Sequence, residues 1–194
     1  SNTLCKFLLL PYLKDFVKQY PHIKITIENH STYQTLKSLE NRSLDIGLVA
    51  KPHNDKTFVF DSLGAIEDIF VATPDYLDNL KQREESEDFF SVANIMLLDE
   101  ENNTRIYIEE YFRDNDISPN SILEVTNMDL LIEFAKTGLG VACVIKEFVE
   151  KELADGTLVQ LPLKAPVNKR EVGYSYVRNA FLSDSMLKFI AFTK

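Results

Sequence analysis

The fold is decided by residues 3–49, which read TLCKFLLLPYLKDFVKQYPHIKITIENHSTYQTLKSLENRSLDIGLV. Apolar side chains recur at steps of three and four residues from Leu9 to Tyr20, which is the period of a helix with one buried face. This helix is expected to end at Tyr20-Pro21, because the residue before a proline is pushed out of the helical region of backbone space. The stretch therefore opens with an amphipathic helix.

The rest of the stretch predicts a strand, a second helix and another strand. Isoleucines alternate with polar side chains over residues 23–27, which is the period of a strand. The pair Ser31-Thr32 is suited to open a helix, and the apolar run from Asp45 to Ala50 has the character of a strand buried on both faces. Strands separated by helices pair in parallel through right-handed crossovers, so the stretch predicts half of an α/β domain.

Several motifs in this order resemble the effector-binding domain of LysR-type transcriptional regulators. They are T-L-x-x-F-L-L-x-P-x-L-x-x-F-x-x-x-Y-P-x-I-x-I-x-I, then S-T and D-I-G-L-V, and later residues 137–142 (TGLGVA) and 152–159 (ELADGTLV). The resemblance implies two Rossmann-like α/β lobes with a ligand cleft between them, as in type 2 periplasmic binding proteins. It implies that residues 1–68 and 170–194 form lobe I and residues 69–169 form lobe II. It also places a strand immediately before Ser1.

The remaining pattern predicts short strands and helices along the whole chain. Strands are expected at 57–60, 66–73, 95–98, 122–125, 141–145, 158–161 and 172–177, with Gly64 separating the first two. Helices are expected after a cap at Asn103 or Thr104 as far as Asn115-Asp116, from Asn127 or Asp129 to Gly138, and over 146–153 and 183–192. The charged stretch 80–88 is interpreted as a solvated surface.

Composition indicates a globular protein with no membrane span. Apolar residues make up 45% of the 194 positions, charged residues 26%, and the net charge is −9. That charge opposes binding of this chain to a nucleic-acid phosphate backbone. The apolar run at residues 7–10 is too short for a signal peptide. Cys5 and Cys143 are interpreted as buried free thiols, with a disulfide or redox role as the alternative, which favours a cytoplasmic location.

Small polar residues stand at four predicted helix starts, and these are the candidate ligand-binding positions. A helix start offers unpaired backbone N–H groups and the positive end of the helix dipole, which suit a small anionic or polar metabolite. The alternative is that these residues are only helix caps, worth ~1 kcal/mol each. The resemblance favours a binding role. The predicted ligand-binding residues are Ser1, Thr3, Ser31, Thr32, Ala50, Lys51, Asn103 and Asn127.

No pattern in the sequence predicts catalysis, a metal site or a cofactor. Gly138-Leu-Gly140 follows a predicted helix and precedes a strand, whereas a phosphate-binding loop needs the reverse order. The three histidines lack metal-ligand spacing, and no serine lies in a nucleophile elbow. We therefore expect no catalytic residue, no bound metal and no cofactor.

The resemblance predicts the sensor module of a transcription factor, with DNA bound by a separate N-terminal winged helix-turn-helix. It also implies a homodimer in which residues 4–28 of one subunit lie beside residues 105–125 of the other. A higher oligomer is the alternative to this dimer. The alternative is a solute-binding protein of a transport system, which shares the architecture. An enzyme on the same fold is a more distant alternative.

Overall fold

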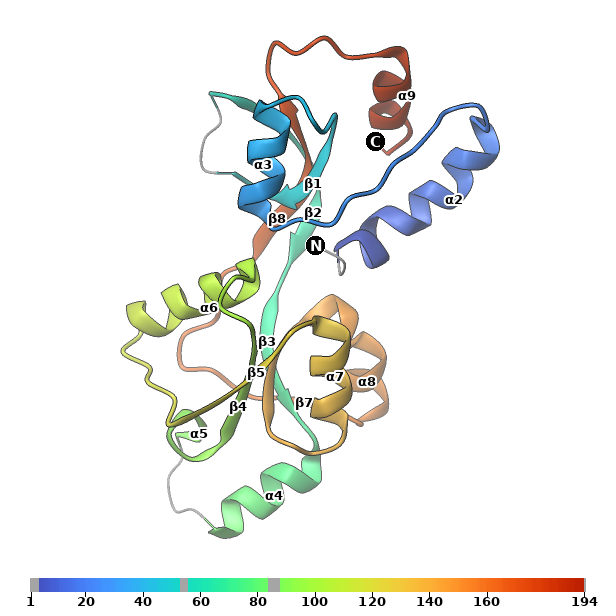
Figure 1. Cartoon of the computed structure of the whole chain (residues 1–194). Coiled ribbons are helices and arrows are strands. Elements are labelled where there is room, and N and C mark those ends of the chain that lie inside the picture. The colour runs from blue at the N-terminus through green and yellow to red at the C-terminus, as the bar shows by residue number, and fades with distance from the viewer. Residues whose placement is uncertain (1–3, 53–55, 84–87, 194) are drawn as a thin grey trace. The chain divides into compact units, whose positions relative to one another are not determined.

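The computed structural model describes residues 4–52, 56–83 and 88–193, and the chain divides into two compact units (Figure 1). Unit 1 comprises residues 1–65 and 170–194, and unit 2 comprises residues 66–169. Each unit contains its own sheet. Among the described residues, no helix has both the length and the apolar character that a bilayer span requires.

Unit 2 is built on a five-stranded mixed sheet with the order β5-β4-β6-β3-β7. The strands are β3 (Asp68–Ala72), β4 (Asn94–Leu98), β5 (Ser121–Val125), β6 (Val141–Ile145) and β7 (Val159–Gln160). Strand β4 pairs in parallel with β5 and β6, and β3 pairs antiparallel with β6 and β7. Every residue of β3 and β6 is buried, as expected for central strands that are covered on both faces.

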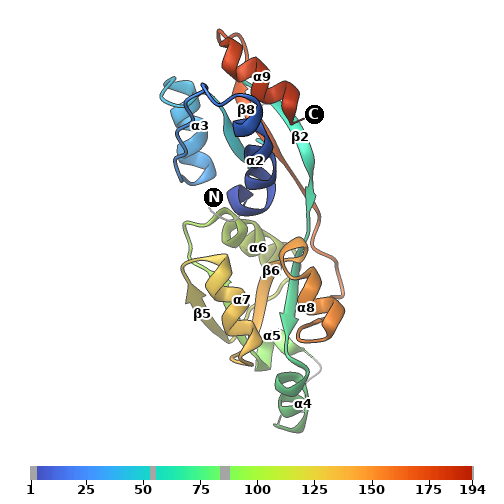
Figure 2. The same ribbon diagram turned by 90° about the vertical axis from the view of Figure 1, so that its right-hand side faces the viewer.

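Helices cover both faces of this sheet (Figure 1). On one face, α5 (Phe89–Val92) and α6 (Asn103–Asp114) pack on Ile95 and Leu97 of β4 in a core rich in aromatic rings. On the other face, α7 (Met128–Lys136) contacts β3, β4, β5 and β6, and Figure 2 views the unit from this side. The connections β4-α6-β5 and β5-α7-β6 join strands that run parallel. The unit continues through η2 (Lys146–Phe148) and α8 (Glu150–Asp155).

Unit 1 contains a smaller sheet with the order β1-β8-β2. Its strands are β1 (Gly47–Ala50), β2 (Phe58–Ile66) and β8 (Arg170–Val177), and β1 pairs antiparallel with β8. Its helices are α2 (Leu10–Gln19), which a π-helical turn η1 (Cys5–Leu9) precedes, α3 (Thr32–Glu40) and α9 (Asp184–Phe192). Phe16 of α2 is almost fully buried, and its ring packs edge-on against Phe189 and Phe192 of α9.

The helices of unit 1 confirm the sequence predictions, whereas the first predicted strand does not form in the described structure. Helix α2 ends at Gln19, beside the predicted stop, and α3 begins at Thr32. The predicted strand at 23–27 is wrong, because residues 24–31 have no regular secondary structure (Figure 1). The predicted parallel pairing of that strand with the run ending at Ala50 is also wrong, since within the described sheet β1 pairs only with β8. An alternating pattern becomes a strand only when a neighbouring strand supplies hydrogen-bond partners.

Other differences concern element boundaries. Gly64, with φ of 146°, lies inside β2 and does not end it. Helices α4 (Pro74–Arg83) and α5 were not predicted, and residues 84–87 of the charged stretch lie outside the described residues. The predicted helix at 146–153 is divided between η2 and α8, and the strand expected at 158–161 shortens to β7.

Candidate functional site

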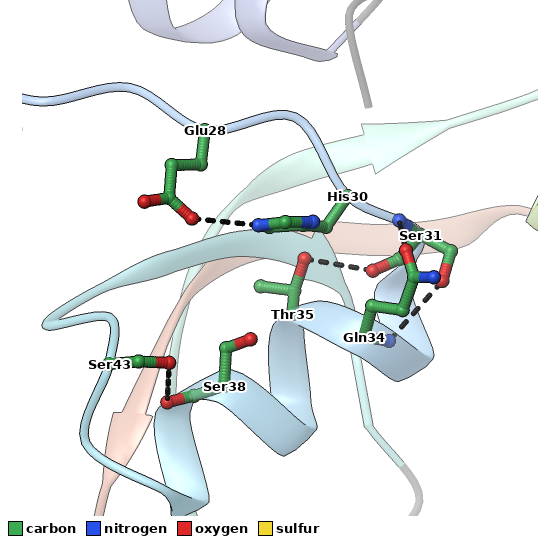
Figure 3. A network of polar contacts seen from close by, with 7 residues as sticks. All are labelled: Glu28, His30, Ser31, Gln34, Thr35, Ser38 and Ser43. Carbon is green, nitrogen blue, oxygen red and sulfur yellow. Dashed lines mark hydrogen bonds and ion pairs between the residues drawn. The ribbon is translucent and has the colours of Figure 1, made fainter.

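The start of α3 carries a complete capping box in unit 1 (Figure 3). The Oγ of Ser31 accepts a hydrogen bond from the N–H of Gln34 at 3.2 Å, and the N–H of Ser31 donates to Oε1 of Gln34 at 3.3 Å. Among the described residues, the N–H groups of Thr32 and Tyr33 and the Thr32 hydroxyl have no hydrogen-bond partner. Ser31 is therefore committed to the cap, whereas Thr32 is half-buried and retains unused donors.

A polar network supports this helix start (Figure 3). The buried hydroxyl of Thr35 donates to the carbonyl of Ser31 at 2.8 Å. Nε2 of His30 lies 2.8 Å from Oε2 of Glu28, on the segment that leads into α3. These contacts restrain the backbone at residues 30–35, which gives the unused donors at Thr32 a fixed position.

The predicted residues Ala50 and Lys51 lie at the carboxyl end of β1. Ala50 pairs with Val172 of β8, and the N–H of Lys51 donates to the carbonyl of Glu171 at 2.9 Å. The Nζ of Lys51 forms an exposed ion pair with the Glu171 carboxylate. The hydrogen bond and charge of Lys51 lower the pKa of Glu171 below its ordinary value. Lys51 supplies a cation at this strand end, and its charge is shared with Glu171.

In unit 2, α6 begins one residue earlier than the sequence suggested. The residue that caps the helix is Asn102, whose Oδ1 accepts a hydrogen bond from the N–H of Thr104 at 3.0 Å, so the expected caps Asn103 and Thr104 are wrong. Asn103 is the first helical residue, and its side chain and N–H bond to no other described residue. Asn103 thus stands at the same place in α6 as Thr32 in α3.

Asn127 caps α7, as the sequence predicted. Its Oδ1 accepts a hydrogen bond from the N–H of Leu130 at 2.9 Å. Helices α6 and α7 start directly after the neighbouring parallel strands β4 and β5, in which Leu98 lies opposite Val125. The structure therefore brings Asn103 and Asn127 to the same carboxyl edge of the unit 2 sheet, where ligands of open α/β sheets bind.

A buried arginine organises this edge, and the sequence prediction missed it. The Nη1 of Arg105 donates to the carbonyl of Leu98 at 3.0 Å and lies 3.1 Å from Oε1 of Glu124, while Nε lies 2.7 Å from Oε1 of Glu109. Only 5% of the Arg105 side chain is exposed. Arg105 therefore joins the end of β4, β5 and the first turn of α6. The spacing of Arg105 and Glu109 by four residues was the available sequence signal.

The helix starts offer hydrogen-bond donation to a small anionic or polar group. Unused donors lie at Thr32 in unit 1 and at Asn103 in unit 2. The starts of α3, α6 and α7 each carry the positive end of a helix dipole. The described part of the chain holds no cluster of three or more His, Cys, Asp or Glu side chains suited to a metal ion. The predicted ligand residues Ser1 and Thr3 lie outside the described residues.

A cavity of about 680 Å³ in unit 2 lies away from these helix starts. Asn94 and Ser121, which are the first residues of β4 and β5, line it together with Lys136 of α7. It therefore borders the amino ends of the two parallel strands, opposite the edge that carries Asn103 and Asn127.

Comparison with known proteins gives a consistent family match. The chain matches the family model described as LysR substrate binding domain over residues 1–194. It is 25% identical over 186 residues to the uncharacterized HTH-type transcriptional regulator YybE of Bacillus subtilis (strain 168), covering 94% of this chain and 61% of YybE. It is 24% identical over 196 residues to the probable RuBisCO transcriptional regulator of Synechocystis sp. (strain ATCC 27184 / PCC 6803 / Kazusa), covering 98% of this chain and 56% of the relative. The chain thus spans less than two thirds of these relatives.

Solved structures show the same fold. The effector binding domain of QuiR in complex with shikimate aligns with a TM-score of 0.73 at 17% identity, covering 98% of this chain and 90% of that one. The Synechocystis PCC6803 CcmR regulatory domain in complex with 2-PG aligns with a TM-score of 0.79 at 16% identity, covering 97% and 90%. The α/β fold expected from the sequence is confirmed by these similarities.

Proposed function

The chain belongs to the LysR substrate-binding domain family, and on that premise we propose that it is the effector-sensing domain of a transcriptional regulator. A separate N-terminal winged helix-turn-helix would bind DNA, a task to which the net charge of −9 on this chain is unsuited. The relatives YybE and the probable RuBisCO regulator are named as transcriptional regulators, which favours sensing over the alternative of solute transport. The proposed domain catalyses no reaction. Its proposed location is the cytoplasm.

The proposed effector is a small anionic or polar metabolite, and its candidate contact positions are the start of α3 in unit 1 and the starts of α6 and α7 in unit 2. The observation that carries this proposal is the set of unused donors at Thr32 and Asn103, each held by a cap on the preceding residue. Related domains were solved with shikimate and with 2-PG, which supports a small ligand. A metabolite that binds one conformation of the domain more tightly than another would shift the population toward that conformation and so change DNA binding.

Isothermal titration of the chain against a panel of small carboxylates and phosphorylated acids tests this proposal. A charge-assisted hydrogen bond contributes about 1.5–3 kcal/mol, so Thr32→Ala and Asn103→Ala should each weaken binding of the same compound by roughly 10- to 100-fold. Asn115→Ala is the matched control for Asn103, because Asn115 caps the opposite end of α6. A compound whose affinity is unchanged in both variants would place the binding site elsewhere.

The proposed homodimer places residues 4–28 of one subunit beside residues 105–125 of the other. Exposed apolar side chains on both segments support it, namely Leu10, Val17, Ile106 and Ile122. A charge at such a contact opposes association, so Leu10→Glu should raise the dimer dissociation constant at least about tenfold in sedimentation experiments. Leu187→Glu on α9 is the control, since Leu187 and Leu10 are both 50% exposed. An equal effect of the two substitutions would exclude this interface.

A further inference from the structure

Unit 1 contains a polar pocket of about 330 Å³, whose lining includes none of the helix starts described above. Tyr12 of α2 and Thr193, which follows α9, line it on the helix side. Residues 61–63 of β2 and Tyr174 of β8 line it on the sheet side. Two helices and two neighbouring strands of one unit therefore form the walls of this pocket, which we call the Tyr174 pocket.

A buried hydroxyl without a hydrogen-bond partner lies in this lining. Tyr174 is only 2% exposed, and its ring packs against Phe189 of α9 with 5.2 Å between the ring centroids. Among the described residues, no atom forms a hydrogen bond with the Tyr174 hydroxyl. A buried polar group left unpaired costs about 1–3 kcal/mol, and such groups are rare in native proteins. The hydroxyl therefore points to a partner that enters the pocket.

The environment of Tyr174 keeps this hydroxyl protonated. Burial raises the pKa of the Tyr174 phenol, and electrostatic interactions with Tyr12 and then Cys5 raise it further. Tyr12 lines the same pocket, so the two phenols are neighbours there. At neutral pH the Tyr174 hydroxyl is consequently a hydrogen-bond donor and carries no charge.

Asp61 gives the pocket a negative charge. Among the described residues that line it, Asp61 has the one ionisable carboxylate, and none is a lysine, arginine or histidine. Burial raises the pKa of Tyr176, and the charge of Asp61, whose Oδ2 accepts a hydrogen bond from the Tyr176 hydroxyl at 3.4 Å, raises it further. A carboxylate accepts about four hydrogen bonds, so Asp61 can bind a cation and keep its partners in the protein.

The polar groups of the pocket are held by the surrounding structure. Gly173 brings β8 so close to β2 that a Cβ atom there would clash with the carbonyl of Asp61, which fixes Asp61 beside the strand that carries Tyr174. The Thr193 hydroxyl donates to the carbonyls of Phe189 and Ile190, so its oxygen remains an acceptor. The lining thus combines one buried donor with two acceptors, one of them charged.

We propose that the Tyr174 pocket binds a small organic ammonium ion that also carries an acceptor oxygen, as an amino alcohol does. The ammonium group pairs with the Asp61 carboxylate, and the ring of Tyr12 in the same lining adds a cation–π attraction. The hydroxyl of Tyr174 donates to the oxygen of the ligand. An anion is repelled by Asp61, so this pocket takes a different class of ligand from the helix starts and does not depend on the effector proposed for them.

Titration of the isotope-labelled 194-residue chain with ethanolamine, followed by NMR, tests this proposal. The amide signals of residues 61–63, 173 and 174 should shift together and saturate. Asp61→Asn removes the charge and should weaken binding roughly 10- to 100-fold, whereas Tyr174→Phe removes one neutral hydrogen bond and should weaken it roughly 3- to 10-fold. Asp15→Asn and Tyr20→Phe are the matched controls in unit 1, because neither residue lines the pocket, and both should leave the affinity unchanged.

Probes of other charge test the class of ligand. Acetate has a similar size and the opposite charge, and it should leave the same amide signals unshifted. Ethylene glycol is uncharged and should bind at least about tenfold more weakly than ethanolamine, because it lacks the ion pair with Asp61. Acetate that shifts these signals as strongly as ethanolamine would overturn the assignment of an ammonium ligand.

The stability of Tyr174→Phe gives a readout that is independent of any ligand. Without a probe, the substitution should leave the thermal midpoint of the chain unchanged or higher, because the hydroxyl has no partner to lose. A lower midpoint would mean that the hydroxyl is paired inside the protein, which removes the donor that the proposal needs. The proposal also fails if ethanolamine shifts none of the five amides, or if its affinity is unchanged in both Asp61→Asn and Tyr174→Phe.

Discussion

The central strands of unit 2 and strand β1 of unit 1 differ in how they are paired. In unit 2, β3 and β6 have neighbours on both sides and every residue is buried. In unit 1, β1 lies at an edge of the described sheet beside β8, and two of its four residues are buried. Both units carry capped helix starts of the same kind. The difference teaches that helix starts form from local sequence, whereas the burial of a strand depends on the segments that pair with it.

The largest expected effect is a loss of stability when a phenylalanine is removed from the aromatic core of either unit. Phe70 of β3 is fully buried among Phe89, Phe90 and Phe112, so Phe70→Ala should lower the free energy of unfolding by about 4 kcal/mol. Phe16 is as deeply buried but lines a groove of about 530 Å³ in unit 1, so Phe16→Ala should leave a less enclosed cavity and cost about 3 kcal/mol. Urea denaturation of each variant measures the difference. Equal losses would mean that the groove is closed in solution.

An intermediate effect is expected at the buried arginine of unit 2. Arg105→Met removes the partner of the Leu98 carbonyl and of two half-exposed glutamates, so it should destabilise the protein by about 2 kcal/mol. Arg113→Met is the control on the same helix, because its ion pair with Asp114 is exposed and should contribute less than about 0.5 kcal/mol. Denaturation midpoints of the two variants check this order, and a milder effect at Arg105 than at Arg113 would contradict it.

The smallest effect separates capping from binding at α3. Ser31→Ala removes the acceptor for the N–H of Gln34 and should cost about 1 kcal/mol of stability. Thr32→Ala removes no hydrogen bond to a described residue, so it should change the free energy of unfolding by less than about 0.5 kcal/mol. The same substitution should weaken binding of the effector. Thermal unfolding and titration on the same two variants separate the roles. A large stability loss in Thr32→Ala would show that Thr32 acts as a structural residue.

The candidate site was predictable where its residues act locally. Ser31 and Asn127 were identified as helix openers because a cap depends on hydrogen bonds within three residues of chain. The error at Asn102 is a shift of one residue, since three polar residues in a row can each serve as the cap. Arg105 was missed because its carbonyl partner at Leu98 lies on another element, and nothing local marks that contact.

The sequence by itself determined the family, the helix starts and the buried strands at 95–98 and 141–145, because hydrophobic period and capping are properties of short segments. Only the tertiary structure decided which of the alternating segments became strands. Residues 23–27 and the run that forms β1 were both predicted as strands, yet β1 pairs with β8 from the far end of the chain, whereas residues 24–29 find no partner among the described residues. A strand is completed by hydrogen bonds to another segment, and a local pattern cannot supply them.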